Sequence, residues 1–527
     1  MEEQSEATPP ARRHRSRRLP LRRLCQAAAL GLFLLLLFHV AWPYATPFRT
    51  DLFASKERVP AELFLWLDPL VVLTGAVGHA LRLGFLWLGG LLALSLFIPR
   101  VFCSHVCPLG TLLDLFGWAI GSRLRRLHVT RRGAWVHTRY YVLAAVVVAA
   151  FGGVALAGYV AAIPLVVRGL TFVLGPLQVT LLKHSGLVPP LGPGTWASVA
   201  GFAAVVGLGL LGRRFWCRYV CPSGALFSLW SLLRVRERRV TEACVHCGKC
   251  VAACSFDAIR EDFSTRPLDC AFCPDCAAAC PVDAIAFGWR RRGARAPERE
   301  DGPAISRRAF AGASAAGAVA AVGLAALGAP RHKLLRPPGS VAEERFLELC
   351  VRCGLCMKAC PGPVLHPAGL GAGLDALWTP VAVPSWAGCH QECNFCGQVC
   401  PTGAIRPLAV EAKRRTHMGL AKVNPQTCLP HRGERDCQLC YDECEAAGYG
   451  AITMVRKRLH EGDGLDAYAA GLDPEEALSI LVPEVDAEKC VGCGLCEYRC
   501  QSFWVKQKHV LDRSAIIVVA ENEHRPG

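Results

Sequence analysis

The spacing of the cysteines constrains this chain more than any other feature of its sequence. Of the 29 cysteines, 24 fall in six quartets, and four of these quartets have the pattern C-x2-C-x2-C-x3-C. A loop with this pattern wraps three thiolates around one corner of a 4Fe-4S cubane, and the fourth cysteine reaches the neighbouring cluster. A secreted disulfide protein would instead spread its cysteines over small loops. The pattern therefore predicts a chain that holds several 4Fe-4S clusters.

The first two quartets read "CVHCGKCVAAC" and "CAFCPDCAAACP" and follow each other closely. Because the fourth cysteine of each quartet serves the other cluster, the spacing predicts two ligand sets. They are Cys244, Cys247, Cys250 and Cys280 for one cluster, and Cys270, Cys273, Cys276 and Cys254 for the other. Structural zinc is the alternative, but it prefers two C-x2-C pairs separated by a longer loop.

Four more quartets lie in the last third of the chain. They are Cys350, Cys353, Cys356 and Cys360; Cys389, Cys393, Cys396 and Cys400; Cys428, Cys437, Cys440 and Cys444; and Cys490, Cys493, Cys496 and Cys500. The second of these has one extra residue in its first gap, and the third begins with C-x8-C. Such insertions lengthen the loop over one cluster corner and leave the other ligands in register. The whole chain is therefore expected to carry six 4Fe-4S clusters.

Two C-x3-C-P pairs account for four of the remaining cysteines. Cys103 and Cys107 form one pair, Cys217 and Cys221 the other, and each pair lies on one face of a helical turn. If a repeat brings the pairs together, they form a four-thiolate site for iron–sulfur or another soft metal. The alternative is a set of metal-free thiols at helix ends. The last cysteine, Cys25, is expected to be a buried small hydrophobe.

The composition indicates a membrane protein. Hydrophobic residues make up 52% of the chain and charged residues 19%, and the mean hydropathy is +0.29. Four apolar runs are expected to span a bilayer, namely 24–44, 81–99, 140–164 and 196–212. The formal net charge of +16 comes largely from arginine blocks that flank these runs. The positive-inside rule then places the N-terminus, the 121–139 loop and residues 213–308 in the cytoplasm, and no nucleic-acid partner is expected.

An internal repeat runs through this membrane part. "LDPLVVL" at 67–73 parallels "LGPLQVT" at 174–180, and each is followed by an apolar run and then by a C-x3-C-P pair. Pro69 and Pro176 are expected to occupy the first positions of short half-helices. A structured outer loop is the alternative. His105, between the first pair of thiols, is the candidate that would take a proton from a quinol, because imidazole titrates near neutrality.

The segment Ile305–Pro330 resembles an export signal although 304 residues precede it. It has a twin arginine, a following Phe310 and a run of small apolar residues, which are features of signals for folded cargo. A fifth apolar helix is expected here, with residues 331–527 in the periplasm. The alternatives are an ordinary fifth span or a linker helix that stays in the cytoplasm.

The motifs "RVFCSHVCPLG" and "RRFWCRYVCPSGAL", followed by two ferredoxin motifs, resemble NapH-type membrane quinol dehydrogenase subunits, with related membrane parts in NosR-type and CcoG-type proteins. The second half, with "SRRAF" and "GERDCQLCYDEC", resembles NapG-type and MauM-type periplasmic ferredoxins. The resemblance implies a fusion of two subunits that takes electrons from the quinone pool to a periplasmic cytochrome or reductase. It also implies that the last four quartets share ligands in nested order, first with fourth and second with third.

The expected fold is an α-helical membrane domain with four spans and an internal repeat, plus two α+β ferredoxin-like domains joined by the fifth helix. The expected parts are a basic tail (1–23), the membrane domain (24–235), a two-cluster domain (236–290), a linker with the anchor helix (291–330) and a four-cluster domain (331–527). No C-x-x-C-H haem motif, P-loop or Gly-rich nucleotide motif occurs, which favours a relay over a complete dehydrogenase for soluble substrates. Alternatives are a CcoG-like metal-reducing assembly factor, a NosR-like accessory protein, and a relay fed by soluble ferredoxin.

Overall fold

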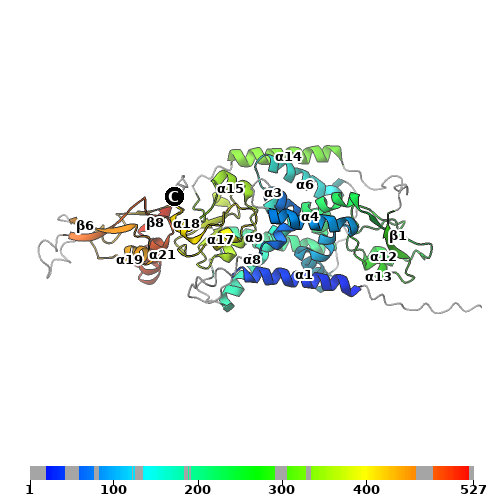
Figure 1. Ribbon diagram of the computed structural model, residues 1–527, viewed down its shortest axis with the longest axis horizontal. Helices are drawn as coiled ribbons and strands as arrows, with labels where there is room; N and C mark the ends of the chain where they lie inside the picture. The colour runs from blue at the N-terminus through cyan, green and yellow to red at the C-terminus, as the bar shows by residue number, and fades with distance from the viewer. Residues whose placement is uncertain are drawn as a thin grey trace, which may run out of the picture. The chain divides into compact units, whose positions relative to one another are not determined.

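The computed structural model describes residues 19–41, 59–75, 82–121, 123–124, 134–182, 188, 191–290, 306–327, 334–458 and 479–520. The chain divides into two compact units, each assembled from separate stretches (Figure 1). Unit 1 comprises residues 1–33, 86–143 and 205–312, and unit 2 comprises residues 34–85, 144–204 and 313–527. Each unit therefore combines apolar helices with cysteine quartets.

Unit 1 combines short helices with one pair of antiparallel strands. β1 (Arg236–Val240) pairs with β2 (Ile285–Trp289), and the first two quartets lie between these strands in the sequence. The two strands thus close the two-cluster segment, as expected for a ferredoxin-like α+β fold. The helices that lie wholly in unit 1 are α5 (Pro108–Ala119), α10 (Phe215–Tyr219), α11 (Pro222–Trp230), α12 (Lys249–Ala253) and α13 (Asp275–Ala278).

Unit 2 joins longer apolar helices to a domain of short helices and three antiparallel hairpins or strand pairs. Its helices are α2 (Leu63–Trp66), α3 (Pro69–Gly75), α7 (Ala157–Val160), α8 (Ala162–Leu182), α15 (Glu343–Leu349), α16 (Leu355–Ala359), α17 (Phe395–Gln398), α18 (Val410–Arg415), α19 (Leu439–Ala446) and α21 (Leu495–Cys500). Its strand pairs are β3 (Leu365–Pro367) with β4 (Pro380–Ala382), β5 (Leu420–Val423) with β8 (Ile516–Val519), and β6 (Ile452–Arg458) with β7 (Ser479–Val485).

Four helices contribute residues to both units. They are α1 (Leu19–His39), α4 (Arg82–Phe97), α6 (Thr138–Phe151) and α9 (Pro193–Gly207). A fifth, α14 (Arg307–Leu327), does the same and contains the twin arginine. Together with α8, these helices form most of the apolar part of the described chain.

Three helical segments in the described part of the chain are long and apolar enough to cross a membrane: Leu21–His39, Ala162–Leu181 and Pro193–Leu210. The first and third agree with predicted runs. The second does not, because the predicted span 140–164 is broken at Gly152–Gly153, where α6 ends and Gly153 has a φ of 79°. The predicted span 81–99 forms α4, whose 16 residues are short for a bilayer.

The half-helix prediction is correct for one copy of the repeat only. Pro69 begins α3, and the Asp68 carboxylate accepts a hydrogen bond from the Leu70 N–H at 3.1 Å, which caps the helix start. Pro176, however, lies inside the 21-residue helix α8. The helix is already formed before Pro176, so the prediction of a second half-helix that starts there was wrong.

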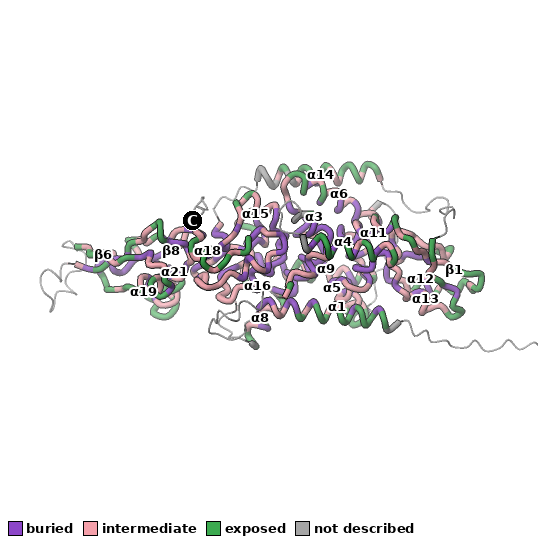
Figure 2. The backbone as a smooth tube through the Cα atoms, viewed as in Figure 1, coloured by how far each residue is buried: buried purple, intermediate pink, exposed green. Residues whose placement is uncertain are grey.

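The export-like segment forms the predicted helix. In α14 the Ser306 hydroxyl accepts a hydrogen bond from the Ala309 N–H at 3.2 Å, and the helix continues to Leu327. Much of its surface is exposed, including the apolar side chains of Val319 and Val322 (Figure 2). Its small residues permit close packing, since a Cβ on Gly317 would lie 2.5 Å from the Ala145 carbonyl oxygen.

Candidate iron–sulfur sites

All 29 cysteines are free thiols, so no disulfide competes with metal binding. In four of the six quartets, which begin at Cys244, Cys270, Cys350 and Cys490, at least one residue beside the second cysteine has a positive φ. His246 and Gly248 flank Cys247 at 53° and 71°, and Arg352 and Gly354 flank Cys353 at 54° and 81°. The loop curls in this conformation, which is costly for the two residues that are not glycine. Such curled loops enclose an anionic centre with successive N–H groups.

The structure brings Cys254, the fourth cysteine of the first quartet, near Cys270, Cys273 and Cys276, as the spacing predicts. Cys280 packs against a group of side chains that contains Cys250 and Cys276. Burial, together with the neighbouring thiols, raises the pKa of Cys270 to about 12. A thiol in such surroundings becomes a thiolate only with a compensating cation, which iron supplies on binding.

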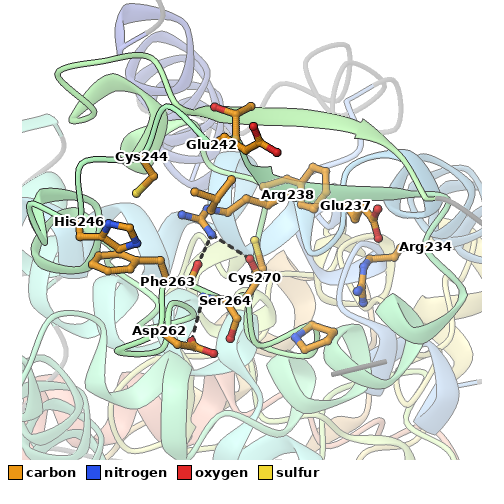
Figure 3. Close-up of a pocket in the computed structure, with 15 residues that line it drawn as sticks. Arg234, Glu237, Arg238, Glu242, Cys244, His246, Asp262, Phe263, Ser264 and Cys270 are labelled. Atoms are coloured by element: carbon orange, nitrogen blue, oxygen red, sulfur yellow. Dashed lines mark hydrogen bonds between the residues drawn. The ribbon is translucent and has the colours of Figure 1, made fainter. Parts of the chain in front are cut away.

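A cavity of about 450 Å³ lies between β1 and the 262–267 loop, with Cys244 and Cys270 in its wall (Figure 3). Arg238, which is buried, projects into it from β1. Its Nη1 donates to the Phe263 carbonyl at 2.9 Å and to the Thr265 hydroxyl at 3.0 Å. The guanidinium therefore holds a fixed positive charge beside thiols of both quartets.

The last four quartets also form reciprocal pairs, but between neighbours in the sequence. Cys400 lies near Cys350, Cys353 and Cys356, and Cys360 lies near Cys389, Cys393 and Cys396. One cavity is lined by Cys428, Cys437, Cys440 and Cys500, and another by Cys490, Cys493, Cys496 and Cys444. The nested order implied by the family resemblance was therefore wrong: the first quartet pairs with the second, and the third with the fourth.

The absence of proline after Cys444 and Cys500 does not disturb these cavities. After Cys500 the chain continues as a π-helical stretch, Gln501–Gln507, that turns Trp504 inward. The Trp504 Nε1 donates to the Cys437 sulfur at 3.2 Å. Gln501 stands directly after Cys500, where other quartets have a proline, and Trp504, four residues after Cys500, covers one thiol site.

The two quartet pairs of unit 2 are in direct contact. The Cys389 N–H donates to the Cys493 carbonyl at 2.7 Å, and a Cβ on Gly388 would lie 2.5 Å from the Leu495 side chain. The helices α17, α21 and α19, which carry cysteines of the last three quartets, follow one another in that order towards β6 (Figure 1). The described order is the site with Cys350, then that with Cys389, then that with Cys490, and last that with Cys428.

The two C-x3-C-P pairs meet inside unit 1. The Cys217 thiol lies close enough to Cys103 and Cys107 to raise the pKa of Cys107, a shift for which burial is the main cause. Cys107 and Cys221 stand at helix starts, followed by Pro108 in α5 and Pro222 in α11. The predicted convergence of the two pairs is therefore present in the structure.

Two buried arginines frame the four thiols with the symmetry of the repeat. Arg100 and Arg214 each precede a pair by three residues, have φ values of 54° and 50°, and are 1% exposed. Each arginine contacts the other copy of the repeat. Arg214, from the second copy, donates through Nη1 to the Cys103 carbonyl at 2.5 Å, and Arg100, from the first copy, lies beside Gly224 of the second. Their guanidinium carbons lie 5.1 and 4.8 Å from the centre of the same Phe256 ring.

Arg100 also connects this frame to the two-cluster segment. Its Nη1 donates to the Asp269 carbonyl at 3.0 Å, immediately before Cys270, and the Ser104 hydroxyl donates to the Ala271 carbonyl at 3.2 Å. The Nε and Nη2 atoms of Arg100 are buried and have no hydrogen-bond partner among the described residues. Unpaired buried donors beside four thiols fit an anionic centre in this space.

The structure leaves the predicted role of His105 untested and contradicts the predicted burial of Cys25. The His105 ring hydrogen-bonds through Nδ1 to the Ser104 hydroxyl at 2.7 Å, and burial together with Arg22 lowers its pKa. Nothing in the structure tests its predicted part in taking a proton. Cys25 was expected to be buried, but it lies on an exposed face of α1, whose apolar surface is not covered by protein at this point.

The motif analysis missed a pair of arginines in unit 2. Arg168, buried in α8, donates from Nη1 to the Arg352 carbonyl at 3.0 Å, and its guanidinium stacks 3.8 Å from the Trp378 ring centre. Arg352 is equally buried and donates to the Ala155 carbonyl at 2.9 Å. A lone arginine inside an apolar run is the signal that would have pointed to Arg168.

No group of three His, Cys, Asp or Glu side chains in the described residues has the geometry of a single-ion site. Ligands of a 4Fe-4S cluster bind different iron atoms, so they stand further apart than the ligands of one ion. The reciprocal thiol cavities, the curled loops and the ferredoxin-like strand pair define an iron–sulfur electron-transfer protein of the ferredoxin type.

Comparison with known proteins agrees with this class. A family described as "4Fe-4S binding domain" matches residues 82–128, 195–241 and 394–416, and a second family of the same description matches residues 238–260. The first two matched segments contain the two C-x3-C-P pairs. No solved structure matches the chain.

Among curated proteins, the ferredoxin-type protein MauM for methylamine utilization of Methylophilus methylotrophus is 33% identical over 213 residues, which is 39% of this chain and 82% of that protein. The ferredoxin-type protein NapG of Escherichia coli K12 is 37% identical over 193 residues, 35% of this chain and 76% of that protein. The chain belongs to this NapG/MauM family. A putative electron transport protein, YccM of the same organism, is 30% identical over 193 residues, 49% of its length.

Proposed function

We propose that this chain is a membrane-bound electron relay of the quinol dehydrogenase type. It would oxidise menaquinol or ubiquinol and pass the electrons through 4Fe-4S clusters to a periplasmic cytochrome or nitrate reductase. One observation carries the proposal in both units: a buried arginine of the apolar part donates a hydrogen bond into a cysteine loop. Arg100 reaches the loop of Cys270 in unit 1, and Arg168 reaches the loop of Cys350 in unit 2.

This contact matters because electrons leave a membrane carrier only where a redox centre is close. Charged side chains are rare in apolar helices, and those that occur mark functional paths. A positive charge beside a cluster also favours its reduced form, because the cluster gains a negative charge on reduction. Each arginine thus fixes the position of a loop and favours electron entry there.

The reciprocal geometry supports six ligand sets. The sets are Cys244, Cys247, Cys250 and Cys280; Cys270, Cys273, Cys276 and Cys254; Cys350, Cys353, Cys356 and Cys400; Cys389, Cys393, Cys396 and Cys360; Cys490, Cys493, Cys496 and Cys444; and Cys428, Cys437, Cys440 and Cys500. Bound clusters supply one-electron transfer, and the protein sets their potentials by burial, charge and hydrogen bonds.

The four C-x3-C-P thiols are proposed as a seventh iron–sulfur site. The contacts of Arg100 and Arg214 with the other repeat copy hold both pairs around one point, and the unpaired donors of Arg100 would be satisfied by the cluster's sulfur atoms. The contacts with Asp269 and Ala271 support a position of this site next to the set with Cys270. Electrons would pass between the two.

The proposed location is the bacterial inner membrane, with residues 213–308 in the cytoplasm and residues 331–527 in the periplasm. The three apolar segments support membrane attachment. The twin arginine at the start of α14 supports export of the four-quartet domain. Protease treatment of intact spheroplasts tests this: digestion beyond Gly339 agrees with the proposal, and full protection contradicts it.

The function is tested with purified chain in lipid vesicles. Addition of menaquinol should bleach the iron–sulfur absorbance, and iron and sulfide analysis should give at least six cubanes per chain. If the clusters stay oxidised with quinol but accept electrons from reduced ferredoxin, the relay is fed from the cytoplasm. If copper binds to the C-x3-C-P thiols and is reduced there, the metal-reducing assembly factor is the better interpretation.

A further inference from the structure

Unit 2 contains a small cavity between the apolar helix α8 and the cysteine loop after α16. Its volume is about 90 Å³. Thr171, Gly175 and Gln178 line it from α8, and Lys358, Cys360 and His366 line it from the loop and β3. The remaining wall is largely apolar and includes several prolines. The helix and the loop are in contact, so the cavity is part of the folded unit.

The cavity wall contains one polar group that is not hydrogen-bonded. Thr171 is 5% exposed, and its hydroxyl has no partner among the described residues. Two turns further along α8, the Lys358 ammonium donates to the Gln178 amide oxygen at 2.7 Å. A buried hydroxyl without a partner is unfavourable. The arrangement therefore favours a ligand that brings an oxygen atom to Thr171.

The rest of the cavity wall suits an apolar ligand. Leu191 in its wall is half exposed, and Phe172 and Val179 of α8 also line the cavity. They give it an apolar rim on a helix that is long enough to lie in a bilayer. Cavities of about 150 Å³ hold a benzene ring. A ring entering this smaller cavity would place one edge inside and its remaining part and tail at the rim.

The cavity also reaches the proposed relay. Cys360 lies in its wall and belongs to the ligand set with Cys389, Cys393 and Cys396. A lipid acyl chain would fill the apolar part but would leave the Thr171 hydroxyl unsatisfied. A quinol has the required combination of ring hydroxyl, apolar ring and isoprenoid tail.

We propose that this cavity is the quinol-oxidising site, an inference that rests on the quinol dehydrogenase function proposed above. A ring oxygen would be bound by the Thr171 hydroxyl. The quinol loses two electrons and two protons: each electron reduces one oxidised 4Fe-4S cluster of the relay, and both protons pass to water. His105 does not line this cavity, so the proposal moves the site away from the residue favoured by the sequence.

The test uses the full chain with its clusters, reconstituted in vesicles, and two substitutions with matched controls. Thr171→Val removes the hydroxyl at constant shape, and Thr180→Val is its control on the exposed side of the same helix. Gly175→Leu fills the cavity, since a Cβ there meets no atom within 4 Å, and Gly201→Leu makes the same change on α9. Chemically reduced viologen measures cluster reduction independently of the cavity.

Two readouts are used: cluster reduction by menadiol and photolabelling by an azidoquinone mapped by mass spectrometry. We expect Thr171→Val to weaken both about tenfold, Gly175→Leu to abolish both, and the two controls to match the wild type. Label should appear on residues 171–179 or 357–367. If the wild type reacts with menadiol and both cavity variants react equally fast, the site is elsewhere. If menadiol does not reduce even the wild type, while viologen does, the proposed function itself is wrong.

Discussion

The first quartet of unit 1 and the first quartet of unit 2 share one cysteine pattern but differ in their surroundings. Cys247 is exposed to solvent, whereas Cys353, in the equivalent position, is buried below the apolar part of its unit. Arg352 and Arg168 enclose the second loop, while the first has the exposed Val245 beside it. Burial and neighbouring charge set cluster potentials. Two quartets with the same spacing can therefore hold clusters with different reduction potentials. An exposed cluster edge suits electron transfer with a soluble partner.

The largest expected effect is the loss of metal on substitution of a C-x3-C-P thiol, since these thiols do not belong to a quartet. Cys217→Ser should remove the metal of the shared site entirely, because one of its four ligands is lost, and should leave the six quartet clusters. Iron and sulfide analysis together with electron paramagnetic resonance measures this. Cys25→Ser, on the exposed face of α1, is the matched control. An unchanged iron content in Cys217→Ser would show that these thiols hold no metal.

The next effect concerns the ion pair that holds the repeat copies together. Asp114 binds Arg214 through two hydrogen bonds of 2.8 and 2.6 Å and also pairs with Arg22. Asp114→Asn leaves the fully buried guanidinium of Arg214 without its counter-charge and should lower the free energy of unfolding by about 3 kcal/mol. Denaturant unfolding measures it. Glu261→Gln, an exposed change in the same unit, should have almost no effect.

The same carboxylate predicts a dependence on acid. Burial would raise the pKa of Asp114, but Arg214 and Arg22 outweigh burial and lower it to about 2. A carboxylate with a lowered pKa stabilises the fold above its ordinary pKa of 3.8 and loses that contribution as the pH falls towards 2. We expect a loss of about 2 kcal/mol over this range. Unfolding of Asp114→Asn should lack this component, and an identical acid profile in both proteins would contradict it.

The smallest effect tests the role of the buried arginine in unit 2. Arg168→Gln should lower the reduction potential of the neighbouring cluster by on the order of 50 mV, because a nearby positive charge is lost. Arg168→Lys should keep most of the potential but lose stability, since lysine cannot reproduce the hydrogen bonds to Ser198 and Gly158. Redox titration of both variants measures this. Arg345→Gln, at an exposed ion pair, is the control.

Much of the site was predictable because its ligands are close in sequence. The reciprocal exchange between Cys254 and Cys280 follows from two adjacent quartets. The family resemblance misled where four quartets allowed several pairings, because nothing in a local pattern says which partner the fourth cysteine reaches. Two predicted helix boundaries were wrong for a similar reason. Hydropathy alone predicted a helix across Gly152–Gly153, where α6 has already ended, and Pro176 lies inside the long helix α8 instead of at a helix start.

The sequence by itself determined the chemistry of this protein: 24 cysteines at cluster spacing, two further thiol pairs, and apolar runs flanked by arginine. These are local features, since three ligands of a cluster lie within one loop. The tertiary structure decided which quartets share ligands, how Arg100 and Arg214 each contact the other repeat copy, and that Thr171, Lys358 and Cys360 line one cavity. Those arrangements depend on contacts between distant segments, and only the packing of the whole chain selects one of the many that the local pattern allows.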